Sequence, residues 1–151
     1  MGSLVRLAIA GGFDPLHEGH VDHIRKAMDL CDELLIFVAS DQQLIRKKGD
    51  VNILCRGRRE IVELVAFGVK EKYSSRCGFI LLYESFDEDG SVSSLIMSLR
   101  PNYFAKGGDR TPENMPRVEI EACKKVGCTI IYGVGDLLNS SSKMNTRKGE
   151  T

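Results

Sequence analysis

Short apolar segments alternate with amphipathic ones along the whole chain, and this alternation predicts strands separated by helices. Apolar runs of strand length lie at residues 4–10, 34–39, 77–83, 102–106 and 129–133. The run at 34–39 is continuous, which is typical of a parallel strand covered on both faces. Apolar side chains recur at helical spacing in residues 18–31, 58–69, 91–99 and 116–126. In the helix at 58–69 we expect Ile61, Leu64, Val65 and Gly68 to lie on one face, the apolar one.

Turn and capping residues delimit these elements. Ser91 is expected to cap the helix that follows it, and Gly127 stands just past the end of the last predicted helix. The polar and basic stretch 40–54 predicts a loop, and the tail from 143 to 151 is expected to fray. Alternating strands and helices predict an α/β fold, a Rossmann-like doubly wound five-stranded parallel sheet in a single domain of residues 1–151.

In such open sheets, ligands bind beyond the carboxyl ends of the strands. The segments expected there are 11–20, 106–116 and 133–142. Two of these segments carry unusual residues, so we expect the functional site at this edge of the sheet.

Composition narrows the class of protein. Lys and Arg number 21, as do Asp and Glu, so the 151-residue chain has no net charge and does not have the basic excess of a general nucleic-acid binder. No apolar run approaches the roughly 20 residues of a membrane span. The N-terminus lacks a signal-peptide layout, whether Met1–Ser3 is native or a cloning remnant. Five cysteines without a Cys-x-x-Cys pair favour free thiols, and we expect a cytoplasmic protein.

All three histidines of the chain fall between residues 17 and 23. His17 and His20 lie three residues apart on the first turn of a predicted helix, after a glycine pair that lets the backbone approach a ligand. Gly19 between them leaves room for a phosphate, to which two imidazoles can donate hydrogen bonds. We expect His23 to be a packing residue with a backbone or side-chain partner. No further histidine completes a metal site, so none is expected.

The same residues carry a family resemblance. Gly12-Phe13-Asp14 followed by His17-Glu18-Gly19-His20 resembles the HxGH signature of the cytidylyltransferase-like nucleotidyltransferases. The resemblance implies a five-stranded doubly wound sheet. It also implies that His17 and His20 contact a nucleoside triphosphate and stabilise the pentacoordinate α-phosphate, while Gly12, Phe13, Asp14 and Gly19 line the nucleotide site.

Further positions resemble the family one at a time. Lys48, with Lys47 as the competing choice, resembles the lysine of a mobile basic loop that reaches the phosphates, and Arg59 fits a phosphate- or substrate-binding arginine. The string at 106–113 is more similar to heptose 1-phosphate adenylyltransferases than to glycerol-3-phosphate cytidylyltransferases. This resemblance adds Gly107, Gly108 and Asp109 to the nucleotide site. A second stretch resembles the start of the family's last helix, and it adds Ser140, Ser141 and Ser142. Residues 135–138 depart from the arginine-containing segment of the glycerol phosphate enzymes.

The resemblance implies an enzyme that transfers a nucleoside monophosphate to a small phosphorylated sugar or alcohol and releases pyrophosphate, with ATP favoured as donor and Mg²⁺ as cofactor. Two alternatives stay open: a CTP-dependent enzyme of the glycerol-3-phosphate type, and a nucleotide-binding module without turnover. The expected partners are the triphosphate and the acceptor, without nucleic acid or membrane, and the sequence leaves a homodimer open.

Overall fold

Five parallel strands form one sheet in the computed structural model, which describes residues 3–135. They are β1 (Arg6–Gly11), β2 (Glu33–Ala39), β3 (Phe79–Ser85), β4 (Tyr103–Ala105) and β5 (Thr129–Ile131), in the spatial order β3-β2-β1-β4-β5. The order reverses direction at β1, so the switch point, where such sheets bind ligands, lies between β1 and β4. The doubly wound parallel sheet predicted from the sequence is confirmed.

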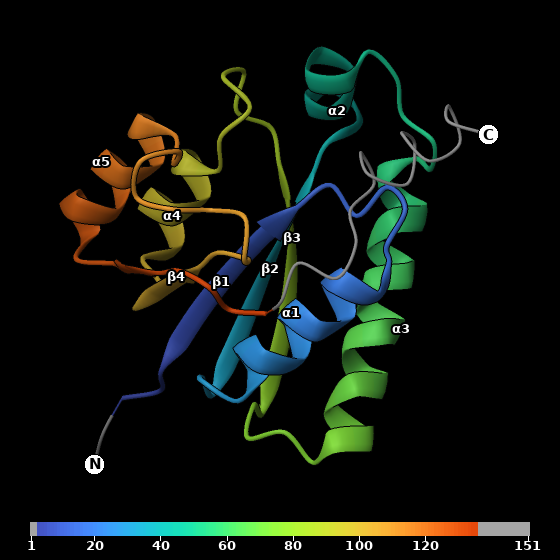
Figure 1. Cartoon of the computed structure of the whole chain (residues 1–151), viewed down its shortest axis with the longest axis vertical. Coiled ribbons are helices and arrows are strands. Elements are labelled where there is room, and N and C mark those ends of the chain that lie inside the picture. The colour runs from blue at the N-terminus through green and yellow to red at the C-terminus, as the bar shows by residue number, and fades with distance from the viewer. Residues whose placement is uncertain (1–2, 136–151) are drawn as a thin grey trace.

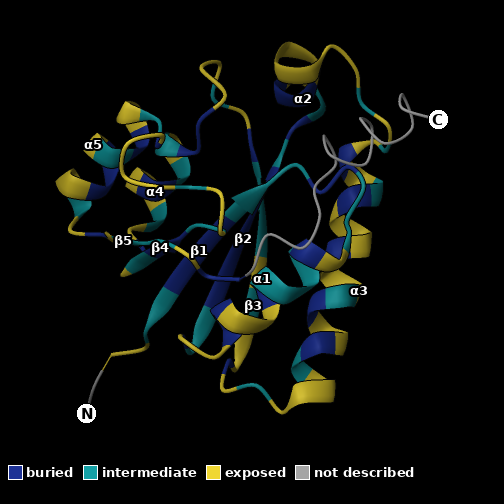
Figure 2. Cartoon of the chain, in the orientation of Figure 1, coloured by how far each residue is buried: buried dark blue, intermediate teal, exposed yellow. Residues whose placement is uncertain are grey.

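Helices cover both faces of the sheet. They are α1 (Glu18–Met28), α2 (Asp41–Lys48), α3 (Cys55–Tyr73), α4 (Ser93–Leu99) and α5 (Arg117–Val126). Figure 1 shows α1 and α3 on one face, α4 and α5 on the other, and α2 beyond the carboxyl ends of the strands. The side chains of β1 divide between two cores: Leu7 and Ile9 pack toward α1 and α3, whereas Ala8 packs toward α4 and α5. Figure 2 shows buried residues along the central strands β1 and β2, whereas β3 and β5 at the edges of the sheet are partly exposed.

The stretch 40–54, expected to be a loop, contains a helix, and that expectation was wrong. Ser40 caps α2 by accepting a hydrogen bond from the Gln43 amide at 3.1 Å, and Gly49 ends the helix in the left-handed conformation. Only Gln43 and Leu44 are buried in α2, so its apolar signal is too small to show in the hydrophobic pattern. As a result, Lys47 and Lys48 belong to the last turn of a capped helix rather than to a loop.

Other differences are smaller. α4 begins at Ser93, and its N-cap residue is Val92. Ser91, the expected cap, lies one position earlier, although its hydroxyl still accepts a hydrogen bond from the Ser93 amide at 3.3 Å. β3 starts two residues later than predicted because its pairing with β2 runs from Phe79 to Ser85. Within residues 3–135, no helix combines the length and apolar character needed to cross a bilayer.

Candidate active site

A cavity of about 730 Å³ opens at the carboxyl ends of the central strands, over the switch point. Its size is that of a small-molecule site. It brings together most of the sequence-predicted site residues: Gly12, Phe13, His17, Gly19, His20, Lys47, Lys48, Gly107, Gly108 and Asp109. Asp14 and Arg59 are not among the residues that line it. Ser140, Ser141 and Ser142 lie outside the described residues, as does the tail from 143.

The two motif histidines are bonded to the start of α1 through their Nδ1 atoms. His17 Nδ1 accepts a hydrogen bond from the Gly19 amide at 3.1 Å, and His20 Nδ1 accepts one from the His17 amide, also at 3.1 Å. This reciprocal arrangement is a capping box built from two histidines. The amides of His17 and Gly19 are therefore occupied by ring nitrogens and are not free to bind an anion.

The capping bonds fix the tautomer of both rings. A neutral imidazole whose Nδ1 accepts must carry its proton on Nε2. His17 and His20 therefore each present one Nε2–H donor, and the rings stack with their centroids 3.8 Å apart. Because each Nδ1 is turned to the backbone, the Nε2–H is the ring donor left for a ligand in the cavity.

Both rings are neutral at physiological pH. Burial lowers the pKa of His20 to about 3, aided by the neighbouring His17, His23 and Lys48. Burial also lowers the pKa of His17, which Glu18 partly offsets. A neutral imidazole with such a low pKa cannot serve as a general acid near pH 7, so the pair is suited to hydrogen-bond donation rather than proton transfer.

Phe13 and Gly12 shape the cavity beside the histidines. The Phe13 ring lies 4.9 Å from the His20 ring, centroid to centroid, and its backbone has a positive φ of 52°. A Cβ on Gly12 would come within 2.8 Å of the Leu44 side chain. A residue without a side chain at position 12 therefore lets α2 approach the motif loop closely.

The two lysines of α2 face different partners. Both line the cavity. The charge of Lys48 lowers the pKa of His17 and His20, whereas that of Lys47 lowers the pKa of Lys106. The electrostatics therefore favour Lys48, of the two lysines between which the sequence left the choice open, as the one that acts on the histidine pair.

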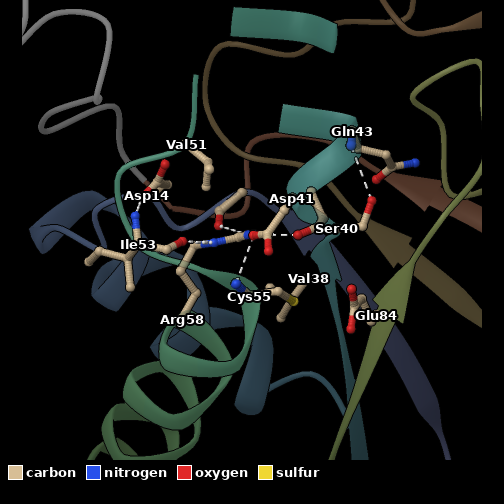
Figure 3. A network of polar contacts seen from close by, with 12 residues as sticks. Asp14, Val38, Ser40, Asp41, Gln43, Val51, Ile53, Cys55, Arg58 and Glu84 are labelled. Atoms are coloured by element: carbon tan, nitrogen blue, oxygen red, sulfur yellow. Dashed lines mark hydrogen bonds and ion pairs between the residues drawn. The ribbon is translucent and has the colours of Figure 1, made fainter. Parts of the chain in front are cut away.

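Asp14 and Arg58 connect the loops around the cavity (Figure 3). The Asp14 carboxylate accepts bonds from the amides of Asn52 and Ile53, each at 2.8 Å, so it holds the segment before α3. Arg58 is fully buried and donates to the carbonyls of three residues and to the Asp41 carboxylate. The three carbonyls are those of Ile53 (2.6 Å), Gly12 (2.9 Å) and Ala39 (2.6 Å).

Arg59, the arginine that the sequence favoured, is half-exposed on α3. Its guanidinium lies 3.9 Å from the Glu84 carboxylate at the end of β3. Its neighbour Arg58 is the one that reaches the motif loop, although its contacts there are with backbone oxygens. A ligand role for Arg59 stays a prediction.

The loop after β4 is held by Asn114, which donates to the Asp109 carbonyl at 2.9 Å and accepts from the Thr111 amide at 2.8 Å. This turn presents Gly107, Gly108 and Asp109 to the cavity. His23 contacts the Val134 carbonyl through Nδ1, which gives it the backbone partner expected from the sequence, and it also lines the cavity.

Sequence reasoning missed several lining residues that have charge or hydrogen-bonding capacity, among them Lys106, Glu119 and Gln43. Lys106 is the residue directly after β4, and its place at a strand end could have singled it out. Glu119 in the first turn of α5 and Gln43 in α2 gave no signal, because a buried polar residue looks like a solvated one in a sequence. No group of three or more metal-ligating side chains occurs within residues 3–135.

Sequence comparison finds relatives whose alignments extend over most of this chain. A bifunctional protein HldE from Pelobacter propionicus is 36% identical over 106 residues, which are 70% of this chain and 19% of that protein. HldE from Rhodopseudomonas palustris is 28% identical over 141 residues, 93% of this chain and 26% of that protein. The chain therefore spans about a fifth to a quarter of the length of these relatives.

Two solved structures have a similar fold. The lipopolysaccharide core biosynthesis protein from Thermoplasma volcanium superposes with a TM-score of 0.61 at 21% identity, covering 89% of this chain and 98% of that one. A protein of unknown function from Archaeoglobus fulgidus gives a TM-score of 0.63 at 22% identity, covering 92% and 96%. The family model for cytidylyltransferase-like proteins matches residues 8–134, a span that holds the motif histidines, α2 and the loop after β4. The chain belongs to the cytidylyltransferase-like family of nucleotidyltransferases.

Proposed function

We propose that this chain transfers the adenylyl group of ATP to the phosphate of a small phosphorylated sugar and releases pyrophosphate. The observation that carries this proposal is the pair of neutral histidines whose Nδ1 atoms are bonded to the backbone, which leaves two Nε2–H donors beside Lys48 at the switch point. The HldE relatives and the string at 106–113 favour ATP and a sugar phosphate over CTP and glycerol phosphate.

The reaction requires no proton transfer from the protein. An oxygen of the acceptor's phosphate, already ionised at neutral pH, attacks the α-phosphorus of ATP. The bond from that phosphorus to the bridging oxygen of the β-phosphate breaks, and pyrophosphate leaves with the electron pair. The His17 and His20 Nε2–H groups donate to the oxygens of the pentacoordinate phosphorus, where charge accumulates. The ammonium of Lys48 offsets charge on the leaving phosphates.

Mg²⁺ enters this proposal as part of the substrate Mg·ATP. The described residues form no cluster that would hold the ion by themselves. Phosphate oxygens and water are the usual ligands of Mg²⁺ in nucleotide sites, and the protein then needs only to bind the complex.

We also infer that the reaction takes place in the cytoplasm, where both substrates occur. All five cysteines are free and buried, which fits a reducing compartment. A homodimer stays a prediction to be checked by analytical ultracentrifugation.

The test is a pyrophosphate-release assay with ATP and then CTP, Mg²⁺ and a panel of sugar phosphates and glycerol 3-phosphate. We expect turnover with ATP and a sugar phosphate, and a decrease in kcat of roughly 10²–10³ for His17→Ala and His20→Ala, the loss typical of one transition-state donor. Near-full turnover in both variants would refute the role of the histidines. Tight ATP binding without pyrophosphate release across the panel would favour the module without turnover.

A further inference from the structure

Lys106 is a partly buried cation in the cavity for which the described residues provide no ion pair. Its Nζ lies 4.6 Å from the centroid of the Phe104 ring, and none of the described carboxylates comes within 4.0 Å of it. Among the neighbouring charges, that of Glu119 acts on Lys106 most strongly and raises its pKa, the charges of Arg110 and Lys47 lower it, and that of Asp109 raises it. A partly buried cation that lines a cavity and has no ion pair among the described residues is an arrangement that favours a bound anion.

This cation is separate from the one assigned to the triphosphate. Lys48 is the last residue of α2, whereas Lys106 directly follows β4. Both groups line the same cavity. The proposed reaction brings two anions together, the triphosphate and the acceptor's phosphate, and the cavity offers a cationic group for each.

Glu119 supplies a second polar group on this side of the cavity. The residue is 6% exposed, and its Oε2 accepts a bond from the Val92 amide at the start of α4 at 3.1 Å. Its Oε1 is buried without a hydrogen-bond partner among the described residues. A desolvated carboxylate oxygen without a donor is destabilising by itself, and the hydroxyl group of a ligand would satisfy it.

We propose that Lys106 and Glu119 form the subsite for the acceptor, with Lys106 Nζ binding its phosphate and Glu119 Oε1 accepting a hydrogen bond from one of its hydroxyl groups. This inference rests on the proposed function, because it takes the acceptor to be the second anion in the cavity. It identifies the acceptor as a phosphorylated polyhydroxy compound and names the residues that select it.

The test measures binding to the full chain by isothermal titration calorimetry with mannose 1-phosphate, glycerol 3-phosphate, inorganic phosphate and Mg²⁺ with α,β-methylene-ATP. We expect Lys106→Met to weaken all three acceptor-side probes at least about tenfold, as for one charge-assisted hydrogen bond, and to leave the nucleotide Kd within about twofold. Lys106→Arg, which keeps the charge, should restore much of the phosphate binding. Lys125→Met, an exposed lysine on α5, is the matched control.

Glu119→Gln tests the hydroxyl contact. The amide oxygen can still accept from the Val92 amide, so α4 keeps its start, but the other atom becomes a donor. We expect this variant to lose the margin by which an organic phosphate binds better than inorganic phosphate, with inorganic phosphate itself little affected. Glu121→Gln, on the exposed side of the same helix, is the control, and thermal unfolding of every variant checks that the fold is kept.

Three outcomes would overturn the inference: a wild-type chain that binds none of the phosphate probes, a Lys106→Met variant that weakens the nucleotide rather than the acceptor probes, or a Glu119→Gln variant that weakens all probes equally. Failure of the proposed function is a different result. In that case the wild-type chain binds the phosphate probes as expected but binds no nucleotide or releases no pyrophosphate.

Discussion

Replacement of Arg58 by methionine should strongly destabilise the protein, although the residue touches no ligand in our mechanism. The guanidinium is fully buried and donates to three backbone carbonyls that belong to the motif loop, the end of β2 and the entry to α3. Methionine fills most of the space and leaves these carbonyls without their donor. Because the fourth acceptor, Asp41, is a third exposed, its ion pair contributes less than the distance of 2.7 Å suggests.

We expect Arg58→Met to lower the free energy of unfolding by about 3–5 kcal/mol, from three buried acceptors at about 1–3 kcal/mol each with partial relaxation. Urea unfolding followed by circular dichroism measures this. Arg59→Met is the matched control, since its exposed contact with Glu84 at 3.9 Å should be worth less than about 1 kcal/mol. An Arg58→Met protein that unfolds within about 1 kcal/mol of the wild type would refute the view that this side chain joins the loops.

The remaining predictions concern pH, charge and backbone space. The low pKa of His20 means that the unfolded chain takes up a proton below pH 6.5 that the folded chain does not, so stability is full above that pH and should fall by roughly 2 kcal/mol at pH 5. Urea unfolding at pH 5 and above pH 6.5 should show a smaller loss of stability for His20→Gln than for the wild type. An equal loss in the two proteins would contradict the low pKa of His20. Lys48→Met should reduce kcat/KM for ATP by at least about tenfold and Lys47→Met by less, because the charge of Lys48 acts on both motif histidines and that of Lys47 on Lys106, and equal effects in the pyrophosphate assay would count against this. Gly135→Ala should cost at least about 1–3 kcal/mol, since φ is +104° and the new Cβ would lie 2.9 Å from the backbone of α1. Gly68→Ala, in open space on α3, should instead stabilise the protein by about 0.5–1 kcal/mol. Thermal melts in which the two variants have the same midpoint would contradict the backbone environment described for these two glycines.

The arrangement of the sheet could be predicted because each strand is an apolar run bounded by turn residues, and because parallel strands follow a single winding rule. α2 could not be predicted in this way, because only Gln43 and Leu44 of its eight residues are buried and they leave no apolar periodicity in the sequence. The face expected on α3 is only partly the one that packs. Val65 packs against the core, but Ile61, Leu64 and Gly68 are exposed, and the buried residues are Val62, Ala66 and Val69. Apolar residues occur on both sides of this helix, and periodicity cannot choose between them.

The site shows the same division. His17 and His20 could be found because their spacing at a helix start has a chemical meaning. The choice between Arg58 and Arg59 depends on which of the two side chains faces the interior of the protein. The sequence does not indicate this, because the two neighbouring residues are of the same type. Lys106 stands at a strand end, but its lack of an ion pair among residues 3–135 can be seen only in the structure, as can the Glu119 oxygen for which these residues offer no donor.

The histidine capping box has a consequence for how the product leaves. Each ring relays the polarity of a backbone amide: the amide donates to Nδ1, and in the proposed reaction Nε2–H donates onward to the phosphate. In that reaction the helix start acts on the phosphate through two uncharged rings, without a formal positive charge at the reacting phosphorus. Neutral donors hold an anion less tightly than cations do, so the site can stabilise a brief accumulation of charge and still release the nucleotide product once that charge has moved to pyrophosphate.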